Sequence, residues 1–94
     1  MIKRLNPILH SELRLAIMSH LLSVGESDFV KIKEITEAAS GNISIQIKKL
    51  QEVGYISVKK GYKNNYHHTQ VSITATGIAE FEKYIEILSQ FIKR

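Results

Sequence analysis

The residues best suited to chemistry in this sequence are polar and basic side chains gathered in one short stretch, residues 40–54. The side chains there that can donate to phosphates and to the edges of bases are Ser44, Gln46, Lys48, Lys49 and Gln51. In the same stretch Ile43, Ile47 and Leu50 recur at helical spacing, so they form one stripe that must be buried. The stretch therefore predicts an amphipathic helix with a polar face, a pattern that an ordinary surface helix shares.

This helix is expected over residues 41–53, because both of its ends carry a recognisable signal. Ser40 or Asn42 can cap its start by accepting a backbone hydrogen bond. Gly54 can adopt the left-handed conformation in which many helices end.

The net charge of +4 is concentrated in one window of the chain. Residues 48–63 contain five lysines and one acid, Glu52, so this window carries +4 and the rest of the chain sums to zero. A basic surface of this kind binds polyanions, because each neutralised phosphate releases counterions. Lysine clusters also serve solubility alone, so charge by itself leaves both interpretations open.

Length and composition set the broad class. A chain of 94 residues with 44% hydrophobic and 23% charged residues is expected to form one globular domain over 1–94. It has no apolar run long enough to cross a bilayer and no signal peptide, so we expect no membrane partner and a cytoplasmic location. The absence of cysteine excludes disulfides, thiolate metal sites and a cysteine nucleophile.

Two helices are predicted before the basic stretch. The first spans residues 7–24, with a proline in its first turn and a glycine at its end. The second is capped by Asp28 and turns its apolar residues inward, namely Phe29, Ile32 and Ile35. A tight turn over residues 38–41 then leads into the polar helix, and this arrangement is typical of a helix-turn-helix.

After Gly54 the apolar period changes from 3.6 to 2, which predicts a β-hairpin. Its strands alternate around Ile56 and Val58 and around Val71 and Ile73, and a long polar tip covers residues 60–68. A hairpin directly after a recognition-type helix is a wing, here residues 59–70, that can reach the DNA backbone or the minor groove.

The last helix is expected over residues 74–93, capped by Thr74. It carries two apolar stripes, one of Ile78, Phe81, Ile85, Leu88 and Ile92 and the other of Tyr84, Ile87 and Phe91. One stripe can pack on the first helix, which leaves the other for a second copy in a two-fold dimer, although both can simply be core. The expected dimer contacts are Phe81, Tyr84, Ile87, Leu88 and Phe91.

The chain resembles winged-helix transcriptional regulators of the MarR and ArsR type, in a small single-domain branch. The resemblance is carried by residues 5–21 with His10-Ser11, by residues 41–56, and by residues 73–77. It implies a mainly α fold with a small β-hairpin, an α+β class, in which a winged helix-turn-helix is joined to a long C-terminal dimerisation helix. It also implies DNA binding as a homodimer, with five residues at or near the DNA: Ser44, Ile45, Gln46, Lys48 and Lys49.

The predicted function is therefore sequence-specific binding of double-stranded DNA, with helix 41–53 in the major groove and a palindromic operator. The expected contacts are Asn42, Ser44, Ile45, Gln46, Lys48, Lys49, Lys59, Lys60, Lys63, Asn64, Asn65 and His67. Gln46 is expected to bond an adenine through N6 and N7. A winged-helix module that docks on another protein is the alternative.

No catalytic residue, metal or cofactor is predicted, and the sequence does not specify an effector ligand. His67 and His68 are adjacent in a strand and so point to opposite faces, which disfavours a shared metal. His10 and His20 are too far apart along one helix to share a metal, and are expected to pack. No nucleophile turn or phosphate-binding glycine loop is present.

Overall fold

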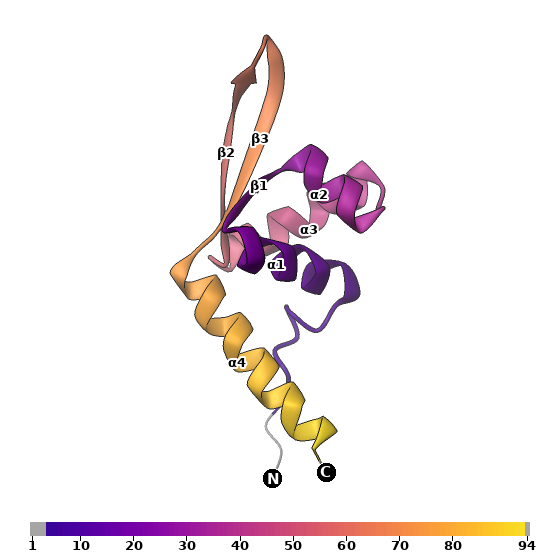
Figure 1. Ribbon diagram of the computed structural model, residues 1–94, viewed down its shortest axis with the longest axis vertical. Coiled ribbons are helices and arrows are strands. Elements are labelled where there is room, and N and C mark those ends of the chain that lie inside the picture. Colours follow the sequence, from indigo (N-terminus) through magenta and orange to yellow (C-terminus); the bar gives the residue numbers. More distant parts are fainter. Residues whose placement is uncertain (1–3, 94) are drawn as a thin grey trace.

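The computed structural model describes residues 4–93, which form an elongated body of 53 × 25 × 21 Å. The elements in chain order are α1 (Glu12–Val24), β1 (Glu26–Asp28), α2 (Phe29–Thr36), α3 (Ser40–Glu52), β2 (Ile56–Lys63), β3 (Tyr66–Ile73) and α4 (Ala75–Ile92). Figure 1 shows the hairpin of β2 and β3 at one end, α1 to α3 in the middle, and α4 extending to the other end. The predicted α+β class is confirmed. Within the described residues, no helix is both long and apolar enough to span a membrane.

The first helix begins later than the sequence predicted. The Ser11 side chain caps α1 by accepting from the backbone N–H of Arg14. Pro7 therefore lies before the helix, in a turn that the side-chain oxygen of Asn6 stabilises by accepting from the N–H of Ile8 at 2.8 Å. The apolar residues of this turn still pack inward, and Leu9 is fully buried.

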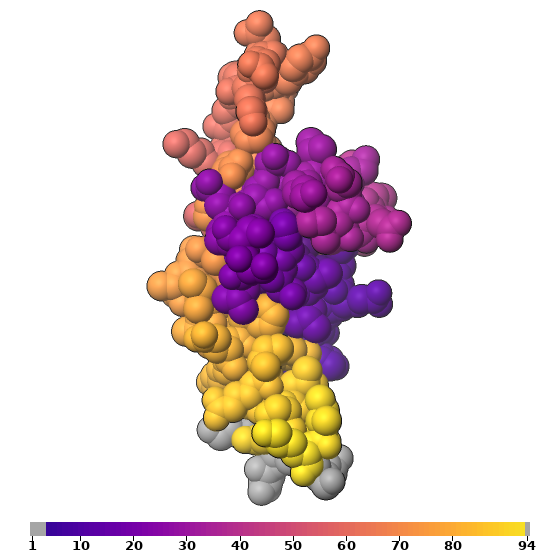
Figure 2. Space-filling model, in the orientation of Figure 1, coloured from indigo at the N-terminus to yellow at the C-terminus, as the bar shows by residue number. Residues whose placement is uncertain are grey.

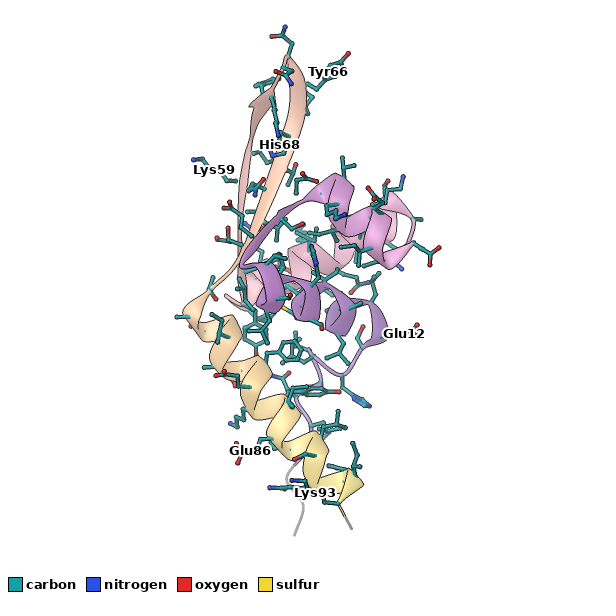
Figure 3. The ribbon with its side chains drawn as sticks, in the orientation of Figure 1. Glu12, Lys59, Tyr66, His68, Glu86 and Lys93 are labelled. Atoms are coloured by element: carbon teal, nitrogen blue, oxygen red, sulfur yellow. The ribbon has the colours of Figure 1, made fainter. Side chains whose placement is uncertain are left out.

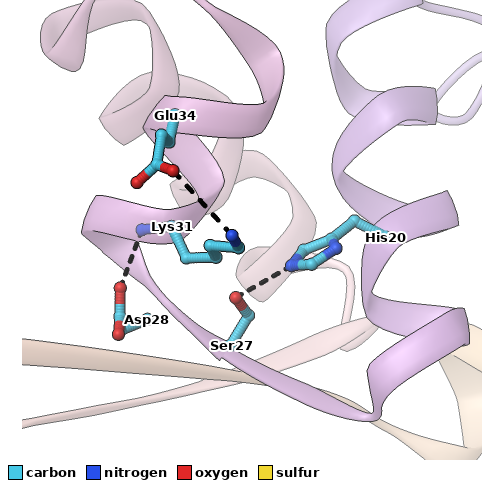
Figure 4. Close-up of polar contacts among 5 residues, drawn as sticks. All are labelled: His20, Ser27, Asp28, Lys31 and Glu34. Carbon is cyan, nitrogen blue, oxygen red and sulfur yellow. Dashed lines mark hydrogen bonds and ion pairs between the residues drawn. The ribbon is translucent and has the colours of Figure 1, made fainter.

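The second helix is capped as predicted, because the Asp28 carboxylate accepts from the N–H of Lys31 at 2.7 Å (Figure 4). Its core contact is the fully buried Ile32. The prediction that Ile35 also points inward is wrong, since 45% of its side chain is exposed. The helix ends one residue after Ile35, and Glu37 adopts a left-handed conformation with φ 55°.

The third helix starts at Ser40, with Ala39 at its N-cap position and no side-chain cap. The predicted capping by Ser40 or Asn42 is wrong, because both residues lie inside the first turn. The predicted end is confirmed, since Gly54 has φ 80°. Ile43, Ile47 and Leu50 form the buried stripe that the helical spacing predicted.

The sheet has three antiparallel strands in the order β1-β3-β2. The sequence did not predict β1, because three residues are too few to show an alternating pattern. The hairpin strands are also longer than expected, and residues predicted as a polar tip form a regular ladder out to Lys63 and Tyr66. Only Asn64 and Asn65 remain as the turn, with φ 52° and 68°. Asparagine tolerates this left-handed conformation better than most residues, which suits a two-residue hairpin turn.

The last helix is capped by Thr74, whose hydroxyl accepts from the N–H of Gly77 at 3.0 Å, as predicted. Three residues of the expected dimer surface are instead buried within the single chain: Phe81, Tyr84 and Ile87. The expectation that they remain open for a partner is therefore wrong. α1 and the segment before it cover one side of α4 as far as Ile87, whereas Phe91 near the end of α4 remains 38% exposed.

At Gly77, α4 lies very close to the backbone of the domain. A Cβ atom at this position would lie 2.1 Å from the carbonyl oxygen of Tyr55. The same carbonyl accepts from the N–H of Thr74 at 3.1 Å, so it is held in place by the residue that caps α4. Only glycine allows the first turn of α4 to pack against this backbone.

We predict that Gly77→Ala destabilises the fold by about 1 to 3 kcal/mol, because the added methyl group must displace backbone atoms. Chemical denaturation measures this change. Gly41→Ala is the matched control, since Gly41 also lies in the first turn of a helix and a Cβ there meets nothing within 4 Å. Equal stabilities of the two variants would show that α4 can shift without cost.

Candidate nucleic-acid interface

α3 presents a continuous polar and basic surface opposite its buried stripe. The exposed residues of this surface are Asn42, Ser44, Ile45, Lys48, Lys49 and Gln51. One member of this surface, Ile45, is apolar. It is 54% exposed, and an isoleucine in solvent contributes nothing to the core. The helix is therefore held by its apolar stripe with the polar surface free, as the sequence predicted.

Gln46 lies between these two faces and is already engaged by the protein. Its side-chain oxygen accepts from Arg14 of α1, and its side-chain nitrogen donates to Asn42 Oδ1 at 2.9 Å. Gln46 is only half-exposed. A bidentate contact with adenine would have to compete with both hydrogen bonds.

The pairing of β2 with β3 determines on which face of the wing each basic residue lies. Lys60 is opposite Thr69 and shares its face with Val58 and Val71, which pack into the domain. Lys59 is opposite Gln70 and lies on the other face, together with Lys63. Figure 3 shows Lys59 pointing away from α2 and α3.

A groove separates α3 from the base of the wing and has a volume of about 580 Å³. Its lining comes mainly from two elements, with Ser44 and Lys48 on α3 and Lys60 and Thr69 on the hairpin. Lysines of the helix and of the wing thus border one concave surface. We call it the α3–wing groove.

The outer part of the wing stands clear of the domain, as Figure 2 shows. Tyr62 and His67 face each other across the strands there, with ring centroids 4.8 Å apart. His68 points to the other face and bonds Gln70 through Nε2 at 2.8 Å, which confirms that the adjacent histidines diverge. Asn64 and Asn65 are exposed at the turn.

Each of the two remaining histidines joins two elements of the fold by a hydrogen bond, although His10 is exposed and lies before α1 rather than on it. His20 of α1 bonds the buried hydroxyl of Ser27 in β1 at 2.9 Å (Figure 4). His10 bonds the Tyr84 hydroxyl of α4, also at 2.9 Å. Among residues 4–93, no three histidine, aspartate or glutamate side chains are grouped so that they could hold a metal ion.

A second pocket of about 490 Å³ lies between the segment before α1 and the middle of α4. Leu5, Ile8 and Ile87 supply apolar lining, whereas Arg4 and Lys83 supply positive charge. It shares no lining residue with the α3–wing groove, so the two are separate.

Sequence reasoning missed Arg14, which contacts α3 through Gln46. No local pattern connects these two residues, because they are 32 positions apart and lie on different helices. It also missed Thr69, which borders the groove from β3. The alternation around Val71 could have revealed Thr69, had the strand been extended two residues toward the tip.

Comparison with known proteins gives a consistent assignment of the fold. The model of the family of winged helix DNA-binding domains matches residues 13–92. An uncharacterized protein of Methanocaldococcus jannaschii is 30% identical over 86 residues, which make up 92% of this chain and 94% of that protein.

Two solved structures are similar over most of the chain. A transcriptional regulator homologue from Pyrococcus horikoshii has a TM-score of 0.84 and 28% identity, over 90% of this chain and 84% of that one. A mutant of MarR from Escherichia coli has a TM-score of 0.76 and 14% identity, over 89% of this chain and 61% of that one. The resemblance to winged-helix regulators is confirmed, and the similar proteins of known class are regulators rather than enzymes.

We predict that Ile45→Ala changes the free energy of unfolding by less than about 0.5 kcal/mol, because the side chain lies largely in solvent. Ile43→Ala, two residues away and fully buried, should cost about 2 to 5 kcal/mol. Thermal and chemical denaturation of the pair measure both values. A large loss for Ile45→Ala would mean that this residue supports the fold rather than an external contact.

Proposed function

Because the chain belongs to the family of winged helix DNA-binding domains, we propose that it regulates transcription by sequence-specific binding of double-stranded DNA as a homodimer. The observation that carries this proposal is the α3–wing groove, in which lysines from a helix and from a hairpin border one concave surface. A groove of this kind can follow a sugar–phosphate backbone while α3 enters the adjacent major groove.

The base contacts are assigned to the exposed residues of α3 that the protein itself does not use. Ser44 can bond a base edge, Lys48 can bond a guanine, and Ile45 can pack against a thymine methyl group. We assign Lys49 to the phosphate backbone of the DNA. Gln46, predicted from the sequence to contact adenine, is assigned to supporting α3, because its amide is bonded to Arg14 and Asn42.

The wing is assigned to the DNA backbone or the minor groove. Lys60 faces the α3–wing groove and should contact a DNA phosphate directly. Lys59 and Lys63 lie on the other face of the hairpin and contribute mainly through the electrostatic field of the protein. Asn64, Asn65 and His67 lie near the tip, where the hairpin can reach the minor groove.

The dimer surface is assigned to the far half of α4. Ile85, Phe91 and Ile92 are exposed there, at 46%, 38% and 75%, and Leu88 is half-buried beside them. A second copy related by a two-fold axis can cover these apolar residues. Two helices related by this symmetry would read two half-sites about 34 Å apart on the DNA, so the operator should be a palindrome.

The alternative is a winged helix that docks on another protein. The two functions differ in their response to salt, because DNA binding releases counterions and a protein interface of mixed polarity does not. Selection of bound sequences from random duplex DNA tests the proposal directly. Enrichment of a palindrome supports it, and failure to enrich any sequence contradicts it.

We predict that Lys60→Ala weakens binding to all DNA sequences about equally and reduces the slope of log affinity against log salt by roughly one unit. Lys59→Ala removes the same charge from the opposite face and should reduce the slope by less. Fluorescence anisotropy titrations at several salt concentrations measure both. Equal slopes for the two variants would mean that a lysine contributes equally to DNA binding from either face of the wing.

We predict that Phe91→Glu converts the dimer to a monomer at micromolar concentration, because it places a charge in the apolar surface of α4. Val30→Glu is the control, since Val30 is also an exposed apolar residue, at 70%, but lies on α2. Sedimentation velocity distinguishes the two states. A wild-type protein that is already monomeric would refute the dimer. Ile87→Glu is unsuitable for this test, because Ile87 is buried and the charge would disturb the fold.

A further inference from the structure

We infer that Arg14 fixes the direction of the Asn42 side-chain amide, so that Asn42 presents N–H donors to a hydrogen-bond acceptor of bound DNA. The inference rests on the proposed function. It adds a residue, Arg14, that determines whether Asn42 offers donors or an acceptor to the DNA. Gln46 connects the two residues, because it is hydrogen-bonded to both.

The three side chains form a chain of hydrogen bonds across two helices. Arg14 donates to Gln46 Oε1 through Nη1, and Gln46 donates from Nε2 to Asn42 Oδ1 at 2.9 Å. The guanidinium group is itself held, because its Nε donates to the carbonyl oxygen of Ile8 in the turn before α1. Arg14 and Gln46 are half-buried, so water has limited access to the start of this chain.

The direction of every bond follows from the chemistry of the guanidinium group. The oxygen and nitrogen of an amide have nearly the same shape, so its neighbours decide which way it faces. Arginine has donors and no acceptor, so Gln46 must turn its oxygen toward Arg14. The Gln46 nitrogen then faces Asn42, where only the oxygen of Asn42 can accept from it.

Asn42 consequently directs its nitrogen away from Gln46. Within residues 4–93, Asn42 Nδ2 donates to no protein acceptor, and the side chain is exposed in the first turn of α3. Recognition helices approach DNA by their first turns. The acceptors available there are phosphate oxygens and the O6 and N7 atoms of guanine.

Gln46→Glu tests this direction. A glutamate still accepts from Arg14, but it offers Asn42 an acceptor in place of a donor, so the Asn42 amide should rotate and turn its oxygen outward. DNA affinity should then fall about tenfold further than in Gln51→Glu, which adds the same charge to the exposed side of α3. The melting temperature should change little, because the contact with Arg14 remains.

A double-mutant cycle separates this effect from simple charge repulsion. In an Asn42→Ala background no amide is left to rotate, so Gln46→Glu should cost no more affinity than Gln51→Glu. If Gln46→Glu costs the same with Asn42 and with alanine at that position, or if Asn42→Ala leaves affinity unchanged for all sequences, the inference is overturned.

The acceptor is identified by comparing DNA sequences. If Asn42→Ala loses the same affinity on all sequences, the acceptor is a phosphate. If the loss of affinity is confined to sites with guanine at one position, the acceptor is that base. If wild type binds no DNA, the proposed function fails and the DNA contact fails with it. The direction of the amide can still be measured without DNA, because NMR should show the Gln46 side-chain N–H groups protected and those of Asn42 exchanging freely. The reverse protection would overturn the direction itself.

Discussion

The arrangement of this protein depends on the close contact between the first turn of α4 and the backbone of Tyr55. Tyr55 follows the end of α3, where its N–H donates to the carbonyl oxygen of Leu50, and it leads directly into the wing. Its hydroxyl accepts from Asn6 at 2.9 Å, so the segment before α1 is tied to the same residue. α3, the wing, α4 and the N-terminal segment therefore meet at one position, and the absence of a side chain at Gly77 allows them to meet.

This junction separates the surface that we propose for DNA from the surface that we propose for dimer assembly. The exposed residues of α3 and the wing lie on one side of it, whereas the exposed apolar residues of α4 lie on the other. Both surfaces are held by the same core, which includes Ile17, Ile43 and Tyr84. A backbone hydrogen bond from Thr74 to the Tyr55 carbonyl connects the start of α4 to the residue before the wing.

Features set by local periodicity could be predicted from the sequence, and features set by distant partners could not. The buried stripe of α3, the caps by Asp28 and Thr74, and the end at Gly54 each depend on a few neighbouring residues. The role of Gln46 depends on Arg14, which the fold brings beside it from another helix. Burial of Tyr84 likewise depends on the segment before α1, including His10, and a helical pattern alone cannot show which stripe that segment covers.

The wing illustrates how a regular ladder of paired strands restricts the insertion of residues. β2 and β3 have eight residues each and pair without a bulge up to a two-residue turn, so every side chain on them has a fixed face. Insertion of one residue in either strand would exchange the faces beyond it and move Lys60 or its neighbours to the wrong side. A longer wing of the same kind must therefore add two residues to both strands at once, which extends its reach by about 7 Å. The length of this hairpin can thus vary only in coarse steps, whereas its composition can vary one residue at a time.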